Sequence, residues 1–315
     1  RDSSTSRGLG DVYKRQNVWR KENREVHKFL RAIGFSDITK KDLEMILDEV
    51  ITRPEIMKIT KDSEGNEFAE LSGSFAANAG ITVRGTYQED DSFHMDYYYP
   101  YVFGTSITTN EQIDVEKHAE KESYAGVCDE VNLGVTLIFY IQNVADYLAE
   151  TNRHLSKIHY GAMLAGLSTE GKILCPVVER KKNDVPAIQK NDRHNQLIAQ
   201  AREGDEDAIE SLTLEDMDTY ALLSQRVMKE DIFSIVKSTF MPFGIESDQY
   251  TVLGEIIDCV TMENKLTHEK LYGMKLLCNN IQFDVCINEK DLLGEPAIGR
   301  RFRGNVWMQG NLCLE

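Results

Sequence analysis

The stretch AGITVRGTY-QEDDS-FHMDYYYPYVFG, residues 79–104, decides the class of fold, because apolar and polar side chains alternate along it. A period of two places successive side chains on opposite faces of an extended strand. The polar segment QEDDS, residues 88–92, separates the two alternating runs and is typical of a hairpin turn. We therefore predict two antiparallel strands here.

The sequence before this hairpin predicts helices, and the sequence after it predicts more strands. Thr39 can cap a helix whose apolar residues recur at helical spacing. These apolar residues are Leu43, Ile46, Leu47, Val50 and Ile51. Farther along, STEGK at 168–172 lies between two apolar runs and predicts another hairpin turn. We expect residues 26–190 to form an antiparallel-sheet domain with N-terminal helices.

The second half of the chain predicts a helical connector followed by a small sheet structure. Residues 191–244 have an acidic helical pattern that ends at MPFG, residues 241–244. Residues 245–315 contain several strand-like runs, two of which are separated by Asn279-Asn280. So many strands in so short a length favour a small OB-like β-barrel. The predicted fold class is therefore α+β.

The first sixteen residues, RDSSTSRGLGDVYKRQ, are explained without any protein function. Ser6–Gln16 back-translates into a string that looks like a sequencing-library adapter, so we expect residues 1–16 to be an adapter-derived artefact. Residues 17–25 are expected to be an untranslated leader read in frame. Val26 can be encoded by GTG, a bacterial start codon, and is the expected first residue of the natural protein.

The composition argues against several classes of partner. The 315 residues include 36 basic and 52 acidic side chains, which gives a formal net charge of −16. Such a charge opposes binding to nucleic acid and to anionic membranes. The longest apolar run, Val135–Tyr140, is too short to span a bilayer. Without residues 1–25 no signal peptide is recognised either, so we expect a cytoplasmic location and reduced thiols for the six cysteines, which include no CxxC pair.

The first candidate site lies on the strand FHMDYYYPYVFG. Strict alternation would place His94, Asp96 and Tyr98 on one face, with His94 and Asp96 available as a general acid/base pair. The alternative is a polar pair at a solvated sheet face, with the aromatic residues in the core. A metal site would need further ligands, and none occurs at a fixed spacing, so no metal and no cofactor are predicted.

The second candidate site lies on GRRFRGNVWMQG, residues 299–310, where alternation gathers arginine, tryptophan and amide side chains on one strand face. The residues of this face are Arg301, Arg303, Asn305, Trp307 and Gln309. They could bind an acidic protein partner, a small anionic ligand or single-stranded nucleic acid. Alternatively, the arginines pair with carboxylates of this acidic chain. The net charge makes nucleic acid the least favoured partner.

Three segments carry a resemblance to a known family: VHKFLRAIGFSDI (26–38), ESYAGVCDEVNLGVTLIFYIQN (122–143) and GRRFRGNVWMQG. Together they resemble an uncharacterised protein family of anaerobic, gut-type Firmicutes that carries a domain-of-unknown-function label. The resemblance covers residues 26–315 and supports Val26 as the first residue. It implies no activity, cofactor or catalytic residue.

The chain has no recognisable nucleophile, metal or nucleotide motif, which favours a non-enzymatic function. We predict a binding or adaptor protein that presents the Arg/Trp strand, with Arg301, Arg303, Trp307 and Gln309, to an acidic protein partner or a small anion. The alternative is a small-ligand receptor or enzyme with its pocket beside His94, Asp96 and Tyr98. The third reading is single-stranded nucleic-acid binding. The sequence specifies no oligomeric state.

Overall fold

The computed structural model describes residues 26–117, 121–153, 159–177, 236–245 and 247–314, with a few single positions between 197 and 212. The segments 1–16 and 17–25, interpreted above as adapter-derived and as leader, lie outside the described residues. Most of the expected helical connector, 191–244, also lies outside them.

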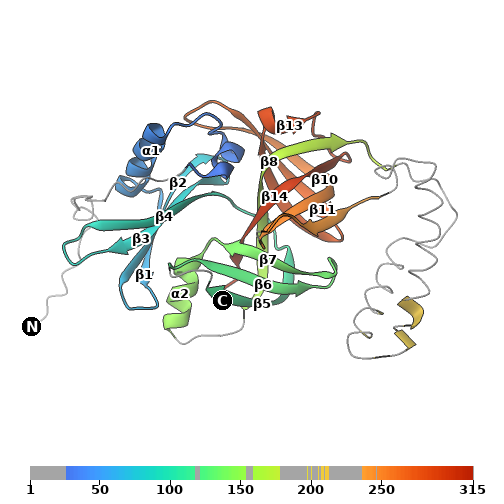
Figure 1. The fold of residues 1–315 in the computed structure, drawn as a ribbon, viewed down its shortest axis with the longest axis horizontal. Coiled ribbons are helices and arrows are strands. Elements are labelled where there is room, and N and C mark those ends of the chain that lie inside the picture. Colours follow the sequence, from blue (N-terminus) through green and yellow to red (C-terminus); the bar gives the residue numbers. More distant parts are fainter. Residues whose placement is uncertain are drawn as a thin grey trace, which may run out of the picture.

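Two helical elements open the described chain (Figure 1). The short 3-10 helix η2, Lys28–Ile33, ends at Gly34, whose φ of 93° is readily accessible only to glycine. Helix α1, Lys40–Thr52, begins after Thr39, whose side chain accepts a hydrogen bond from the Asp42 backbone N–H. The sequence prediction of this helix and its cap is confirmed.

A four-stranded antiparallel sheet follows α1, in the order β1-β2-β3-β4. Its strands are β1 (Ile56–Lys61), β2 (Glu67–Ala76), β3 (Ala79–Tyr87) and β4 (Phe93–Val102). Strands β3 and β4 are the hairpin predicted from residues 79–104. One face of this sheet packs on α1 and η2 in an apolar cluster that includes Leu47, Val83 and Met95.

The remaining strands form a ten-stranded sheet. Its first strands are β5 (Thr109–Lys117), β6 (Tyr124–Glu130), β7 (Val135–Ile141) and β8 (His159–Leu174), with helix α2 (Val144–Asn152) between β7 and β8. The later strands are β9 (Thr239–Pro242), β10 (Gln249–Glu263), β11 (Lys270–Cys278), β12 (Ile281–Asn288), β13 (Leu292–Leu293) and β14 (Arg301–Leu312), with the 3-10 turn η3 (Glu289–Asp291) before β13.

The long strands β8 and β14 join the two halves of the chain. They pair antiparallel from Ala162↔Leu312 to Leu174↔Arg301. Strand β14 also pairs with β10 and, in parallel, with β7, while β8 also pairs with β5 and, in parallel, with β12. Together with the hairpins β5–β6, β6–β7, β10–β11 and β11–β12, these pairings close two rings of strands that share β8 and β14.

The predicted α+β fold class is therefore wrong. The described residues are mostly strand, in two large sheets with few short helices. No separate OB-like barrel forms from residues 245–315, because its strands pair with strands of 109–174 in one sheet. The described end of the expected helical connector, Thr239–Pro242, is strand β9 rather than helix.

The turn predicted at STEGK, residues 168–172, is also wrong. The segment lies inside strand β8, and the pairing with β14 shifts by one residue so that Thr169 has no partner. Such a β-bulge absorbs an extra residue without reversing the chain. The small and polar residues of STEGK are thus explained by a bulge between two long strands.

No helix in the described parts of the chain has both the length and the apolar character needed to cross a membrane.

Candidate functional site

Strand β14 keeps the alternation that the sequence predicts, because it pairs with β10 without a register shift. The residues of its predicted Arg/Trp face nevertheless have different environments. Arg301 is buried, and its guanidinium donates to the carbonyl oxygens of Cys175 (2.9 Å) and Val236 (2.6 Å). Burial lowers the pKa of Arg301. These contacts give Arg301 a role in holding adjacent chain segments together.

Trp307 is buried under the N-terminal segment. Its ring stacks on Phe29 with a centroid separation of 5.2 Å, and His27 lies 5.1 Å away on centroids. The indole Nε1 donates to the Asp248 carboxylate at 2.7 Å. Only 7% of Trp307 is exposed, so its aromatic surface is already used for packing.

Gln309 is fully buried between the two sheets. Its Nε2 donates to the carbonyl of Pro100 at 2.9 Å, and its Oε1 accepts from Gln142 Nε2 at 2.8 Å. These hydrogen bonds tie β14 to β4 and to the end of β7. Of the residues on the predicted strand face, Arg303 and Asn305 line a pocket.

The imidazole of His27, which packs on Trp307, makes the stability of the protein depend on pH. Burial, reinforced by the charge of Lys28, lowers the pKa of His27 from 6.5 to about 4. The neutral ring accepts a hydrogen bond from the backbone N–H of Phe29 at the start of η2. The unfolded chain therefore takes up a proton at a higher pH than the folded protein, and acid favours unfolding.

We expect His27 to contribute a loss of about 2 kcal/mol in the free energy of unfolding between pH 7 and pH 5. Urea unfolding at both pH values, for wild type and for His27→Gln, measures this contribution. The wild type should lose more stability than the variant, since carboxylates titrate in both proteins. An equal loss in both proteins would refute the assignment to His27.

The residues of the other candidate site do not share one face of β4. Asp96 has no partner residue on β3, because Arg84 pairs with Tyr97 and Gly85 with Met95. This bulge breaks the alternation between His94 and Tyr98. The phenol of Tyr98 is buried and accepts from the backbone N–H of His27 at 2.9 Å.

His94 and Asp96 remain near each other, at 3.7 Å between Nδ1 and Oδ1. The His94 side chain is 53% exposed, and that of Asp96 is 24% exposed. The structure thus places them at a solvated edge while Tyr98 faces the interior. This is the geometry expected of a polar surface pair.

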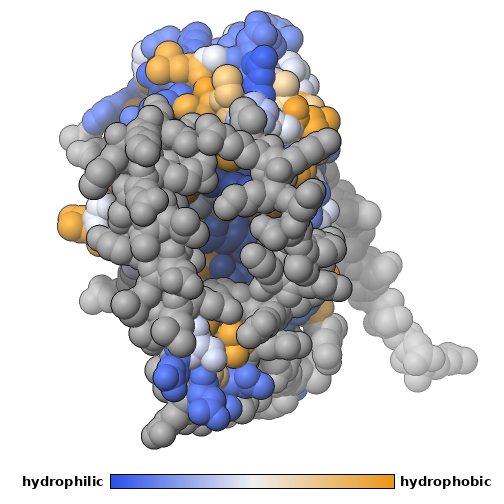
Figure 2. All heavy atoms as spheres, turned by 90° about the vertical axis from the view of Figure 1, so that its right-hand side faces the viewer, coloured by the Kyte–Doolittle hydropathy of each residue, from blue (hydrophilic) through white to orange (hydrophobic). Residues whose placement is uncertain are grey.

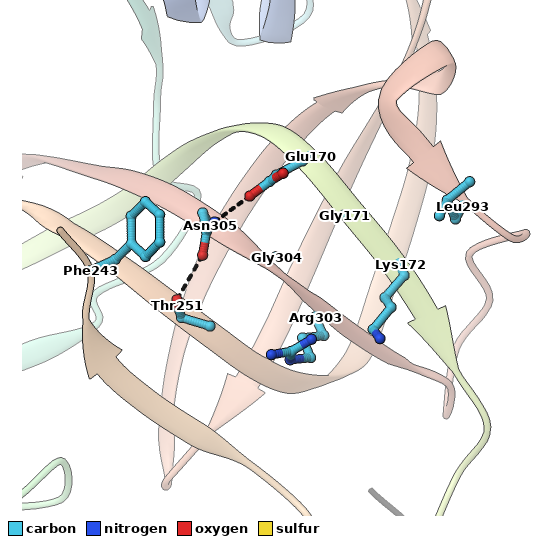
Figure 3. Close-up of a pocket in the computed structure, with 9 residues that line it drawn as sticks. All are labelled: Glu170, Gly171, Lys172, Phe243, Thr251, Leu293, Arg303, Gly304 and Asn305. Atoms are coloured by element: carbon cyan, nitrogen blue, oxygen red, sulfur yellow. Dashed lines mark hydrogen bonds between the residues drawn. The ribbon is translucent and has the colours of Figure 1, made fainter.

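The pocket that contains Arg303 lies over strands β8, β14 and β10 and has a volume of about 380 Å³ (Figure 3). Arg303 and Lys172 are direct cross-strand partners, and their side chains extend to the same side of the strands in Figure 3. Phe243 and Leu293 lie at opposite sides of the pocket and are 42% and 75% exposed.

A chain of hydrogen bonds crosses the same three strands. Thr251 Oγ1 donates to Asn305 Oδ1 at 2.6 Å, and Asn305 Nδ2 donates to the Glu170 carboxylate. With Lys172 and Arg303 beside one carboxylate, the lining residues carry a net positive charge in a chain of net charge −16. Figure 2, viewed from the right-hand side of Figure 1, shows hydrophilic residues recessed near the centre of that face.

Two paired glycines, Gly171 and Gly304, let the strands meet closely beneath this pocket. A Cβ on Gly171 would lie 2.4 Å from the ring of Phe302, and one on Gly304 would lie 2.5 Å from the Glu170 carbonyl oxygen. A side chain at either position would clash, so glycine allows β8 and β14 to pair closely under Lys172 and Arg303.

A second cluster, buried between the two sheets, was not identified from the sequence. Arg84 is fully buried and forms an ion pair with Glu70, at 2.6 Å between the guanidinium and Oε1. It also donates to the hydroxyls of Tyr97 (2.9 Å), Tyr140 (2.8 Å) and Tyr99 (3.1 Å). We call Arg84, Glu70 and these tyrosines the arginine cluster.

The arginine cluster connects the two sheets through residues that are far apart in the sequence. Arg84 donates to the carbonyl oxygens of Ile141 (3.0 Å) and Gln142 (2.8 Å) at the end of β7. Glu70 Oε2 accepts from the Ala145 N–H in the first turn of α2 at 2.8 Å. Burial opposes the charge of Arg84, but the surrounding tyrosines and Glu70 outweigh it and keep its pKa well above the ordinary value.

Among the described residues, no group of side chains is arranged to hold a metal ion and the most deeply buried thiols are unreactive. In those parts of the chain no group of three His, Cys, Asp or Glu side chains is arranged to hold a metal ion. Burial raises the pKa of Cys128, Cys278 and Cys286 to about 12, so these thiols stay protonated at neutral pH.

Comparison with known proteins gives one match. A protein-family model described as "Domain of unknown function, E. rectale Gene description (DUF3881)" matches residues 30–310. A search of curated proteins and a search of solved structures returned no match. The sequence resemblance to an uncharacterised gut Firmicute family is thereby confirmed.

Proposed function

Because the chain belongs to the DUF3881 family, which is described as a domain of unknown function, we propose a function from the pocket itself. We propose that the protein is a non-enzymatic binding protein that holds a carboxylate or phosphate group between Lys172 and Arg303. The observation that carries the proposal is the direct cross-strand pairing of these two cations within one pocket.

Two like charges directly opposite each other on a sheet repel, and an anion placed between them is attracted to both. Arginine and lysine are the usual ligands of phosphate and carboxylate groups in proteins. Because the chain as a whole is negatively charged, an anion is attracted to this positively charged pocket and repelled by the acidic surface elsewhere. The exposed Phe243 and Leu293 supply apolar contacts for the rest of the ligand.

The proposal keeps Arg303 and Asn305 from the predicted Arg/Trp strand, since both line the pocket, and leaves out the other residues of that face. Arg301, Trp307 and Gln309 bind other parts of the chain and position β14. Nucleic acid is not favoured as the partner, because the lining residues add only a small positive charge to an acidic protein.

We expect Arg303→Glu and Lys172→Glu each to raise the Kd for inorganic phosphate or citrate at least about tenfold, the equivalent of about 1.4 kcal/mol. Isothermal titration calorimetry at low ionic strength measures this effect. Lys41→Glu, on the exposed surface of α1, makes the same change of charge away from the pocket and should leave the Kd nearly unchanged.

Three results would oppose the proposal. These are no saturable binding of either anion, an equal loss of affinity in Lys41→Glu, and unchanged affinity in the two pocket variants. Tight binding of a single-stranded oligonucleotide with a steep salt dependence would instead favour nucleic acid.

A further inference from the structure

The face of the four-stranded sheet that looks toward α2 is polar, although it is covered by other elements. Strand register aligns two rows of side chains across this face. The first row is Ile56, Ser72, Thr82 and Tyr99, and the second is Lys58, Glu70, Arg84 and Tyr97. Packed sheet faces are normally apolar, so hydroxyls and charged groups on a covered face are unusual and suggest a function.

A pocket of about 320 Å³ opens beside these rows. Its lining comes from all four strands of the small sheet, from the β7–α2 junction, and from β8 and β14. In Figure 1, α2 lies beside β1 at this side of the molecule. The pocket is distinct from the Lys172/Arg303 pocket, with which it shares no residue.

The charged groups of this inter-sheet pocket are paired with one another. Lys58 and Asp146 form an ion pair at 2.5 Å, and both side chains are about two-fifths exposed. The Glu70 carboxylate is held by Arg84 and by the N–H of Ala145. The lining residues therefore carry little net charge, which favours an uncharged ligand.

The neutral polar groups retain hydrogen-bonding capacity. Ser72 and Thr82 share one hydrogen bond at 2.8 Å, and Thr82 also hydrogen-bonds with the Tyr99 hydroxyl. A hydroxyl has one donor and two acceptor positions, so both residues retain capacity for a further hydrogen bond. Gln142 uses Nε2 on Val102 and Gln309, while its buried Oε1 has no partner among the described residues.

Asn311 lines the same pocket from β14, and its side-chain amide makes no hydrogen bond to another residue that the structure describes. The pocket lining therefore offers both hydrogen-bond donors and acceptors, which suits ligand groups that can donate and accept. Hydroxyl groups are such groups.

The pocket also has an apolar side. Phe103, Ile56, Met163 and Leu312 line it together with the amides and hydroxyls. A ligand that is hydroxylated at its edge and apolar on its ring face satisfies both kinds of lining, because ring C–H groups pack on aromatic and aliphatic side chains.

We propose that the inter-sheet pocket binds a small, uncharged, polyhydroxylated ligand of the size of a monosaccharide. Asn311 and the Ser72–Thr82 pair bind its hydroxyls, and Phe103 contacts its ring face. This second site is independent of the anion site proposed above.

The test uses the whole chain and glucose, galactose, mannose and sorbitol as probes, with binding followed by changes in NMR chemical shift. At least one probe should saturate in the millimolar range or tighter. Asn311→Ala and Thr82→Val should each raise its Kd at least about fivefold. Asn110→Ala, an exposed asparagine on β5 outside the pocket, should leave the Kd unchanged.

Arg303→Glu should bind the sugar as the wild type does, so failure of the anion site and failure of this site can be told apart. The proposal is overturned if no probe saturates, if the zwitterion glycine betaine binds instead, or if binding survives both Asn311→Ala and Thr82→Val. Unfolding curves recorded for each variant show that a loss of binding is not a loss of fold.

Discussion

Replacing Arg84 with methionine is expected to lower the free energy of unfolding by about 4 kcal/mol, because the substitution breaks a buried ion pair by removing one partner. Glu70 would keep its carboxylate in a site where, among the described residues, only the Ala145 N–H remains to bind it. The carbonyls of Ile141 and Gln142 would lose a charged donor at the junction between the sheets.

Urea unfolding followed by circular dichroism measures this loss. Arg53→Met changes an exposed arginine at the end of α1 and should alter stability by no more than about 0.5 kcal/mol. The double variant Glu70→Leu/Arg84→Met removes the unpaired charge and should be more stable than Arg84→Met alone. A loss below about 1 kcal/mol in Arg84→Met would show that the arginine cluster does not hold the sheets together.

Replacing Trp307 with alanine is expected to cost about 3 kcal/mol or more, because it empties a packed site between η2 and β14. The change removes the stack on Phe29, the contact with Tyr140 and the hydrogen bond to Asp248. The loss should appear as a lower midpoint of unfolding by far-UV circular dichroism, since the substitution also removes a fluorescent reporter.

Trp307→Phe separates packing from hydrogen bonding. It retains an aromatic ring and loses only the Nε1 donor, so it should cost about 1–2 kcal/mol. Both variants should bind phosphate at the Lys172/Arg303 pocket as the wild type does, at temperatures where they are folded. If a Trp307 variant kept full stability but lost phosphate binding, Trp307 would belong to the binding surface. Its role in packing would then be contradicted.

The sequence identified two residues of the proposed anion pocket, Arg303 and Asn305, but not the second cation, Lys172. Arg303 is visible in a strand face rich in arginine. The STEGK pattern predicts a turn at Lys172, whereas the residue lies in β8 beside Arg303 of β14. These two paired residues are more than a hundred positions apart in the chain. Arg84 has no local signal either, because an arginine in an alternating strand normally faces solvent.

The sequence by itself determined the elements whose signals are local. Helix α1 with its Thr39 cap, the β3–β4 hairpin and the β11–β12 hairpin all follow from apolar periodicity and turn residues. At the last turn, Asn279 and Asn280 both have positive φ, of 47° and 67°, which asparagine tolerates better than most residues. The family resemblance was likewise contained in the sequence.

Only the tertiary structure decided which strands pair and which faces are covered. A strand pattern shows that two faces alternate, but not what packs against either face. The N-terminal segment covers Trp307, the β7–α2 junction covers Arg84, and β8 joins the two predicted domains into one sheet. These contacts depend on packing and hydrogen bonds between residues far apart in the chain, whose energies no local periodicity encodes.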